Sequence, residues 1–159
     1  MDRPSFDILG FLDECSRPVS VATVTRQEGP ALAMMWFVLD DGRLWFHTPE
    51  DSNRPSPFLR AAGEGQDVAA MIATFNPPTD VRQVRTTGPA RLEADNSERV
   101  RRIYSRYVET WTLKWERQAT ASHYHLWSMS PQRGMAVAYR NLEDSPAFRW
   151  SDPSRLLRL

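Results

Sequence analysis

The chain has little that would direct it to a membrane, an oxidising compartment or a nucleic acid. It has 159 residues and a single cysteine, Cys15. A lone cysteine cannot form a disulfide within the chain, so we expect a reducing compartment, the cytoplasm. The longest unbroken apolar run, residues 31–39, has nine residues, whereas a membrane helix needs roughly 20. The first ten residues lack a basic start followed by an apolar stretch, so we expect no secretory signal.

The chain also lacks an excess of positive or negative charge. The chain has 20 basic and 20 acidic residues, and Lys114 is the one lysine among the basic residues. We interpret the preference for arginine as a bias of genome composition. No long Lys/Arg-rich run is present, so nothing indicates a nucleic-acid or anionic-membrane partner.

The chain is nevertheless rich in strand signals. Apolar residues make up 41% of the sequence, enough for a single domain, residues 1–159, with a packed core. The turn Asp40-Asp41-Gly42 joins two apolar segments in the manner of a hairpin. Seven segments have the alternating or continuous apolar pattern of strands: 19–24, 31–39, 44–48, 67–75, 81–93, 124–129 and 134–139.

Short connections between these segments favour antiparallel pairing. A sheet of this kind protects its edges when it closes on itself. We therefore expect a mainly β fold, a small antiparallel split barrel of six to seven strands with a few helices. The helices are expected at residues 5–15, with Ser5 as the N-cap, and at 57–63 and 95–115.

The loop after the third predicted strand carries groups that bind phosphate. Thr48, Ser52, Asn53 and Arg54 occur together just before the predicted helix 57–63. The planar guanidinium of arginine can donate two charge-assisted hydrogen bonds to a phosphate, and the free N–H groups of a helix N-terminus favour anions. The same residues would also suit an ordinary solvated loop with a capping serine.

A few isolated polar residues indicate a binding or catalytic site less strongly than this loop does. Gln83 offers a donor and an acceptor in the middle of a strand, which suits a heterocyclic ligand or simply solvent. His123 and His125 share a strand face, but no third ligand accompanies them, so we expect no metal site. Cys15 has no histidine at a spacing that would make it a nucleophile.

Four short motifs follow one another along the predicted strands and loops. They are His47-Thr48, Ser52-Asn53-Arg54, Arg82-Gln83-Val84 and Gly88-Pro89-Ala90-Arg91-Leu92. In type and order they resemble the FMN-binding split β-barrel family typified by pyridoxamine 5′-phosphate oxidase. The resemblance covers residues 19–93 well and residues 124–133 less closely.

This resemblance implies a flavin site. The family grips the flavin phosphate with the loop that corresponds to residues 52–54, and binds flavin through the glutamine at position 83. The backbone of residues 34–37 would face the polar edge of the flavin ring, although Met35 and Trp36 equally suit a core. The cofactor-binding residues implied are Met34, Met35, Trp36, Phe37, His47, Thr48, Ser52, Asn53, Arg54, Gln83, Trp127 and Arg133. In the oxidase the tryptophan contacts the ligand from the partner subunit, but the last two residues would also suit a surface pair.

The chain lacks several cations of the family pattern. Leu32, Asn53 and Phe37 stand where the oxidase has Arg or Lys, and Val137 replaces a further arginine. These losses argue against the oxidase's own substrate. Arg60 is a candidate replacement for the missing phosphate-binding cation.

The resemblance implies an FMN-dependent oxidoreductase with an unknown small-molecule substrate. One alternative is an enzyme of the same fold that uses the deazaflavin F420, whose anionic tail would need a basic groove. Arg54, Arg60 and the arginines of residues 99–106 would provide one. The other alternative is a protein that binds flavin or haem without turnover. Family members are homodimers with the flavin at the subunit interface, so we expect a homodimer here.

Overall fold

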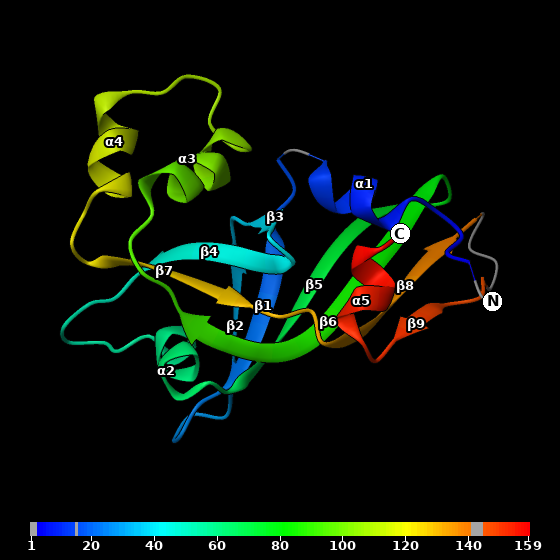
Figure 1. The fold of residues 1–159 in the computed structure, drawn as a ribbon, viewed down its shortest axis with the longest axis horizontal. Coiled ribbons are helices and arrows are strands. Elements are labelled where there is room, and N and C mark those ends of the chain that lie inside the picture. Colours follow the sequence, from blue (N-terminus) through cyan, green and yellow to red (C-terminus); the bar gives the residue numbers. More distant parts are fainter. Residues whose placement is uncertain (1–2, 15, 141–144) are drawn as a thin grey trace.

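The computed structural model describes residues 3–14, 16–140 and 145–159, and antiparallel strands dominate it (Figure 1). The strands are β1 (Val19–Val24), β2 (Pro30–Met35), β3 (Val38–Asp40), β4 (Arg43–Pro49), β5 (Asp67–Asn76), β6 (Asp80–Leu92), β7 (Tyr124–Met129), β8 (Arg133–Tyr139) and β9 (Phe148–Trp150). The helices are α1 (Ile8–Asp13), α2 (Pro57–Glu64), α3 (Ser97–Ser105), α4 (Leu113–Ala119) and α5 (Pro153–Leu157). The predicted mainly β, antiparallel fold is confirmed.

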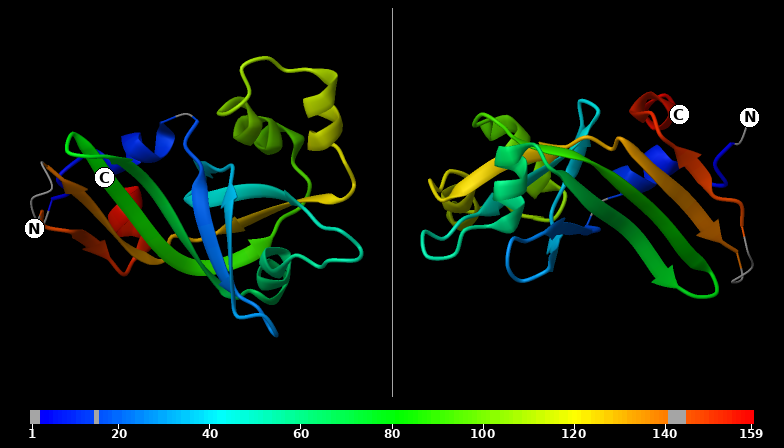
Figure 2. Two further views of the ribbon diagram at one scale, coloured as in Figure 1. Left: turned by 180° about the vertical axis from the view of Figure 1, so that it is seen from behind. Right: turned by 90° about the horizontal axis from the view of Figure 1, so that it is seen from below.

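The strands form a strongly bent sheet in the order β2-β1-β5-β6-β7-β4-β3, and β8 and β9 continue from β6. Strand β6 has 13 residues. It pairs with β5 and β8 along most of its length and with β7 through residues 90–92. This long strand therefore belongs to both halves of the bent sheet, as the two views of Figure 2 show.

The predicted strand 31–39 is two strands in the structure, and β9 was not predicted. Strand β2 pairs with β1, whereas β3 pairs with β4. The chain thus passes from one half of the sheet to the other at Trp36 and Phe37. There the N–H of Phe37 donates to the hydroxyl of Tyr107 at 3.2 Å instead of to a strand. An apolar run without Gly or Pro carries no sign of this crossing, because both halves bury apolar side chains.

The helix predictions were wrong at two boundaries. Asp7, rather than Ser5, caps α1 by accepting the N–H of Gly10 at 3.0 Å. The predicted helix 95–115 is divided into α3 and α4 by a non-helical connection. Cys15, for which we expect no nucleophilic role, lies outside the described residues.

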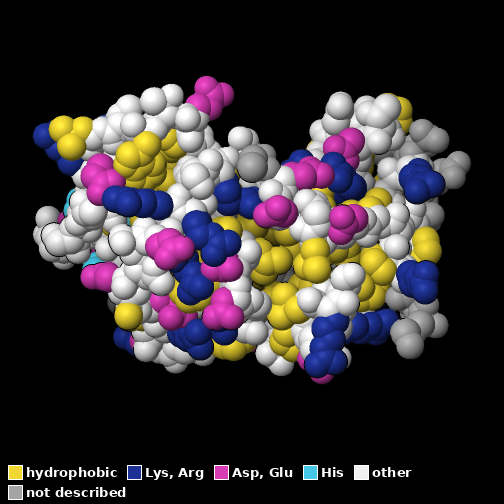
Figure 3. All heavy atoms as spheres, turned by 45° about the horizontal axis from the view of Figure 1, so that its top comes forward, with side chains coloured by type: hydrophobic (Ala, Val, Ile, Leu, Met, Phe, Trp, Pro, Cys, Tyr) yellow, Lys and Arg dark blue, Asp and Glu magenta, His cyan; other side chains and the backbone are white. Residues whose placement is uncertain are grey.

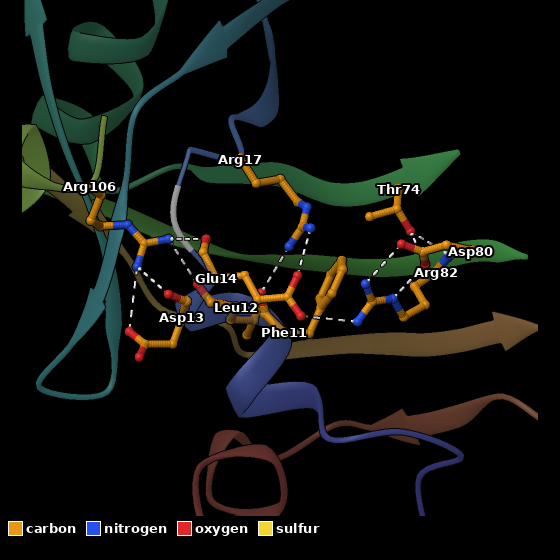
Figure 4. A network of polar contacts seen from close by, with 9 residues as sticks. All are labelled: Phe11, Leu12, Asp13, Glu14, Arg17, Thr74, Asp80, Arg82 and Arg106. Carbon is orange, nitrogen blue, oxygen red and sulfur yellow. Dashed lines mark hydrogen bonds and ion pairs between the residues drawn. The ribbon is translucent and has the colours of Figure 1, made fainter. Parts of the chain in front are cut away.

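Arg106, directly after α3, links the end of α3 to the end of α1 (Figure 4). Its guanidinium donates to the carbonyls of Leu12 and Glu14 at 3.1 Å and to that of Asp13 at 3.3 Å. The last carbonyls of a helix have no partner within it, so a cation at this end is stabilising. Arg106 is only 8% exposed.

Arg82, from the predicted triplet, belongs to the same polar network. It donates to Asp80 at 2.7 Å and to Glu14 at 3.2 Å, and Asp80 also accepts from the hydroxyl of Thr74. These contacts join the β5–β6 turn to the end of α1. Arg82 thus has a structural role, whereas its neighbour Gln83 points to the other side of β6 because strand side chains alternate.

Apolar side chains fill the barrel. Phe46 and Trp127 are fully buried partners across β4 and β7, with ring centroids 4.4 Å apart. Phe58 of α2 packs on Trp127 at 6.3 Å. A second apolar cluster lies outside β3, β4 and β7, beneath α3 and α4. Among the described residues no helix is long and apolar enough to cross a membrane.

Candidate functional site

A cavity of about 770 Å³ lies between the β1–β2 turn and the start of α2. It contains three arginines, Arg26, Arg54 and Arg60, and one acidic residue, Glu28. We call it the arginine cavity, and its lining residues are Thr25, Arg26, Gln27, Glu28, Asn53, Arg54, Pro55, Ser56, Pro57 and Arg60. The tertiary structure thus brings the loop predicted to bind phosphate next to a turn that is distant in sequence.

Two of these arginines have unused donors. Arg60 donates through one terminal nitrogen to the carbonyl of Val24 at 2.8 Å, and its buried Nε has no hydrogen-bond partner. Arg54 forms no side-chain hydrogen bond or ion pair within the described residues. Arg26, in contrast, is paired with Glu64. The cavity therefore holds a net positive charge with free N–H groups, which suits an anion such as phosphate.

The helix N-terminus contributes less than the sequence suggested. Ser56 caps α2 by accepting the N–H of Leu59 at 3.3 Å, and Pro57 has no N–H to offer. The predicted Ser52-Asn53-Arg54 cluster lies in a turn before the helix. Its backbone donates to Asp51, from Asn53 at 2.9 Å and from Arg54 at 3.0 Å. Asn53 and Arg54 line the cavity, but Ser52 does not.

A groove of about 710 Å³ crosses the outer face of β1, β5, β6 and β8. We call it the sheet groove. Most of its surface is apolar, and Arg85, Arg133 and Arg149 are the charged residues in its lining. The other lining residues are Ser20, Ala22, Leu32, Ala69, Ala70, Met71, Thr86, Thr87, Gly134, Met135, Trp150 and Ser151.

The register shows how the sheet groove is built. Leu32, Ala22, Ala69, Thr87 and Arg133 are successive cross-strand partners and form one row. Direct partners in a sheet point to the same face, so one exposed surface runs from β2 to β8. Leu32 is 74% exposed. The end of β1 at Val24 adjoins the arginine cavity, so the two sites share a strand.

Three predicted site residues lie on this outer face. Met34 is 70% exposed and pairs with Ser20 in the next row. Gln83 is half-buried and lies two residues before Arg85 on the same side of β6. Arg133 lines the groove and forms an ion pair with Asp67 at 3.1 Å. The structure thus brings Met34, Gln83 and Arg133 onto one face.

Trp36 and His47 lie elsewhere, under α3 and α4. Trp36 stacks on Tyr107 at 4.9 Å and also contacts Tyr104. His47 contacts the hydroxyl of Tyr104 through Nδ1 at 2.9 Å, and Gln118 of α4 donates to the same hydroxyl. These residues form an aromatic cluster on the side of the barrel away from the sheet groove.

Burial keeps this aromatic cluster uncharged. It lowers the pKa of His47 from 6.5 to about 4; the charge of His125 lowers it further, and that of Asp95 opposes the shift. Burial also raises the pKa of Tyr104 to about 12. His47 is therefore neutral near pH 7 and is committed to a structural hydrogen bond.

The side chains of Trp127, Phe37 and Met35 lie in the core of the barrel. Trp127 has no exposed surface, and its indole N–H donates to the hydroxyl of Thr48 at 2.9 Å. Phe37 is fully buried as well, and Met35 is nearly so. The side chain of Trp127 is therefore not available to stack on a ligand, which corrects that prediction. The prediction for residues 34–37 concerns their backbone and stays a prediction. Sequence alone could not separate these aromatic and apolar side chains from a ligand surface, because both environments favour the same residue types.

The arginines of α3 do not form an open basic groove. Arg99 and Arg102 both pair with Asp40, at 2.9 and 2.8 Å, and Arg101 pairs with Glu116 at 2.9 Å. Arg106 is buried at the end of α1, as described above. Figure 3 shows arginines and acidic side chains side by side on the face that it displays.

Three arginines of these sites were not predicted from the sequence, namely Arg26 of the arginine cavity and Arg85 and Arg149 of the sheet groove. Arg26 lies in the β1–β2 turn, and Arg149 lies on the unpredicted β9. The alternation of β6 could have placed Arg85 on the same face as Gln83. No local signal could have placed Arg149, because its position depends on long-range pairing with β8.

Residues 9–138 match the family model of pyridoxamine 5′-phosphate oxidase. The chain belongs to this family. No curated protein matches it in sequence. The predicted family is therefore confirmed, while the cations that distinguish the named oxidase remain absent at Leu32, Phe37 and Asn53.

Solved structures share the fold at low sequence identity. A conserved hypothetical protein from Mycobacterium tuberculosis is 19% identical, with a TM-score of 0.67 over 92% of this chain and 93% of that one. A putative pyridoxamine 5′-phosphate oxidase from Listeria innocua is 18% identical, with a TM-score of 0.60 over 82% and 94%. The haem storage protein HutZ from Vibrio cholerae is 14% identical, with a TM-score of 0.61 over 92% and 94%. At these identities the likeness concerns the fold.

Proposed function

We propose that the protein binds flavin mononucleotide and acts as an FMN-dependent oxidoreductase. The observation that carries the proposal is the arginine cavity, where Arg54 and Arg60 have donors without partners beside an exposed apolar sheet face. A flavin mononucleotide has the matching parts, a phosphate dianion and a flat, largely apolar ring. Family membership supports the same cofactor.

The residues fit this cofactor as follows. Arg54 and Arg60 would hold the phosphate, with Asn53 beside them. The exposed strand around Leu32 and Met34 would face the ring, and Gln83 would offer its amide. When bound, the flavin supplies hydride chemistry, so the protein's part is to bind, orient and shield it. We assign no acid or base to the protein.

The first experiment is an absorbance spectrum of the freshly purified protein, followed by titrations with FMN, F420 and haem. Flavin bands near one per chain, or saturable FMN binding, would support the proposal. A protein that binds none of the three would overturn it and leave the family and the fold unchanged.

Haem binding without turnover is the second candidate. The sheet groove is apolar and has three arginines in its lining, and haem is a flat apolar ring with two carboxylates. HutZ, a haem storage protein, shares the fold. An F420 site has less support, because the arginines of α3 that were expected to bind its tail are paired with acids. A haem absorption band that saturates while FMN does not bind would favour this second candidate.

The expected homodimer has a surface that suits it. Leu32, Met34 and Met71 are 74%, 70% and 39% exposed on the outer sheet face. Apolar side chains clustered on one face commonly mark a protein contact. We propose that a second copy covers this face and thereby encloses the flavin. Cytoplasmic location stays a prediction.

A further inference from the structure

Two arginines at the far end of the sheet groove lie outside the arginine cavity that we propose for the flavin phosphate. Arg85 lies on β6 and Arg149 on β9, and each is the direct cross-strand partner of Met135 on β8. Direct partners point to the same face, so two guanidinium groups flank one methionine. Both arginines line the groove.

Neither arginine has an acidic partner in the part of the chain that the structure describes. Arg85 contacts the sulfur of Met135, a weak acceptor, and within the described residues neither Arg85 nor Arg149 forms an ion pair. The third arginine in the lining, Arg133, is paired with Asp67. Among residues 3–14, 16–140 and 145–159, no Asp or Glu lines the groove. Two like charges on one face repel each other, and an anion between them removes the repulsion.

The rest of the groove sets the character of the ligand. Met71 is the neighbour of Arg85 in the same row, and Met135 and Leu32 supply further apolar surface. A ligand that fills such a site has an apolar body and an anionic end.

We infer that Arg85 and Arg149 form an anion-binding end of the sheet groove, and that the substrate is a small, largely apolar molecule carrying a carboxylate or phosphate. The inference rests on the proposed function in one respect, that the groove receives the molecule on which the flavin acts. Arg149 lies beyond residues 9–138, the part of the chain that matches the family model. The site is therefore built partly from a segment outside that match.

The test uses two fluorescent probes of similar apolar body. One is 8-anilinonaphthalene-1-sulfonate, which carries an anionic group, and the other is uncharged N-phenyl-1-naphthylamine. Both are titrated into the full chain and into the double variant Arg85→Gln/Arg149→Gln. The control is Arg117→Gln/Arg158→Gln, which removes the same charge at two exposed arginines outside the groove.

We expect the double variant to bind the sulfonate roughly tenfold more weakly, as loss of charged hydrogen bonds would produce, and to bind the neutral probe as the wild type does. The control should match the wild type with both probes. Added salt should weaken sulfonate binding in the wild type more than in the double variant. Equal sulfonate affinity in the wild type and the double variant, or wild-type preference for the neutral probe, would overturn the inference.

Two measurements on the same samples separate this inference from the proposed function. FMN titration tests the flavin proposal alone, since a wild type that prefers the sulfonate but binds no FMN would overturn that proposal and not this one. Light scattering of the double variant tests whether Arg85 and Arg149 instead serve a contact between subunits. If the double variant changes the association state while its sulfonate affinity is unchanged, the arginines serve a subunit contact and the inference is wrong.

Discussion

Two faces of the barrel, formed by strands of similar apolar character, differ in what lies on them. The face of β3, β4 and β7 is covered by α3 and α4, which bury Tyr104 to 1% exposure against the aromatic cluster. No helix of the described residues lies on the face of β2, β1, β5 and β8, where Leu32 and Met34 are exposed. We call them the covered face and the bare face.

Met34 and Trp36 show what the difference teaches. They are two residues apart and would share a side in a continuous strand. Because the strand breaks between β2 and β3, Met34 lies on the bare face, whereas Trp36 packs against Tyr107 on the covered face. Side-chain type does not separate the two positions, but the path of the backbone does. The candidate ligand sites lie on or beside the bare face.

The largest expected effect is on the covered face. Tyr104→Ala should lower the free energy of unfolding by about 3–4 kcal/mol, the usual cost of removing a large buried aromatic side chain. Met34→Ala on the bare face should change it by less than about 0.5 kcal/mol. Urea unfolding followed by tryptophan fluorescence measures both. Similar losses of unfolding free energy in the two variants would mean that the faces are not distinct. A loss of stability in Met34→Ala that grows with protein concentration would indicate that a second copy covers this face.

The stability of the protein should also depend on pH, through His47 on the covered face. The pKa of His47 is about 4 in the folded protein and 6.5 when unfolded, so below pH 6.5 the unfolded chain binds the proton more readily. Stability is therefore full above pH 6.5 and falls as the pH drops toward 4, by on the order of 3 kcal/mol.

Urea unfolding at several pH values between 7.5 and 4 measures this loss. His47→Gln should remove most of this pH dependence. The control is His123→Gln, which changes an exposed histidine and should leave the pH dependence in place. A wild-type pH profile that persists in His47→Gln would assign the effect to another group.

A substitution in the arginine cavity, beside the bare face, should have an intermediate effect, and this effect is on FMN affinity. Arg54→Ala should weaken FMN binding by roughly 1.5–3 kcal/mol, the range for a charged hydrogen bond, while stability stays near that of the wild type. Quenching of flavin fluorescence gives the affinity. Arg117→Ala, an exposed arginine of α4, is the matched control. Unchanged FMN affinity in Arg54→Ala would remove this residue from the site.

The smallest expected effect is on dimerisation through the bare face. Leu32→Glu should weaken dimerisation at least about tenfold, because it places a carboxylate in an apolar contact, without altering the stability of the single chain. Leu113→Glu on α4, where leucine is 63% exposed, should have no such effect. Light scattering over a range of concentrations measures both. A wild type that is monomeric at micromolar concentration would contradict the dimer.

Much of the fold was predictable because its signals are local. Alternating apolar residues predicted β1, β4, β5, β6, β7 and β8 within a few residues, and Pro57 with a following apolar turn predicted α2. The loop with Arg54 was also predicted as a phosphate site, and the structure places it in a cavity with Arg26 and Arg60. These features depend on neighbouring residues, which a sequence displays directly.

The sequence by itself determined the β class, the family and most strand boundaries, since backbone alternation and short turns are properties of adjacent residues. Only the tertiary structure decided that Trp127 and Phe37 are core, that His47 is held by Tyr104, and that Arg85 and Arg149 share a rim. Each of these depends on which distant segments pack together. A side chain of given chemistry is a core residue or a ligand contact according to what covers it, and that is settled by long-range packing.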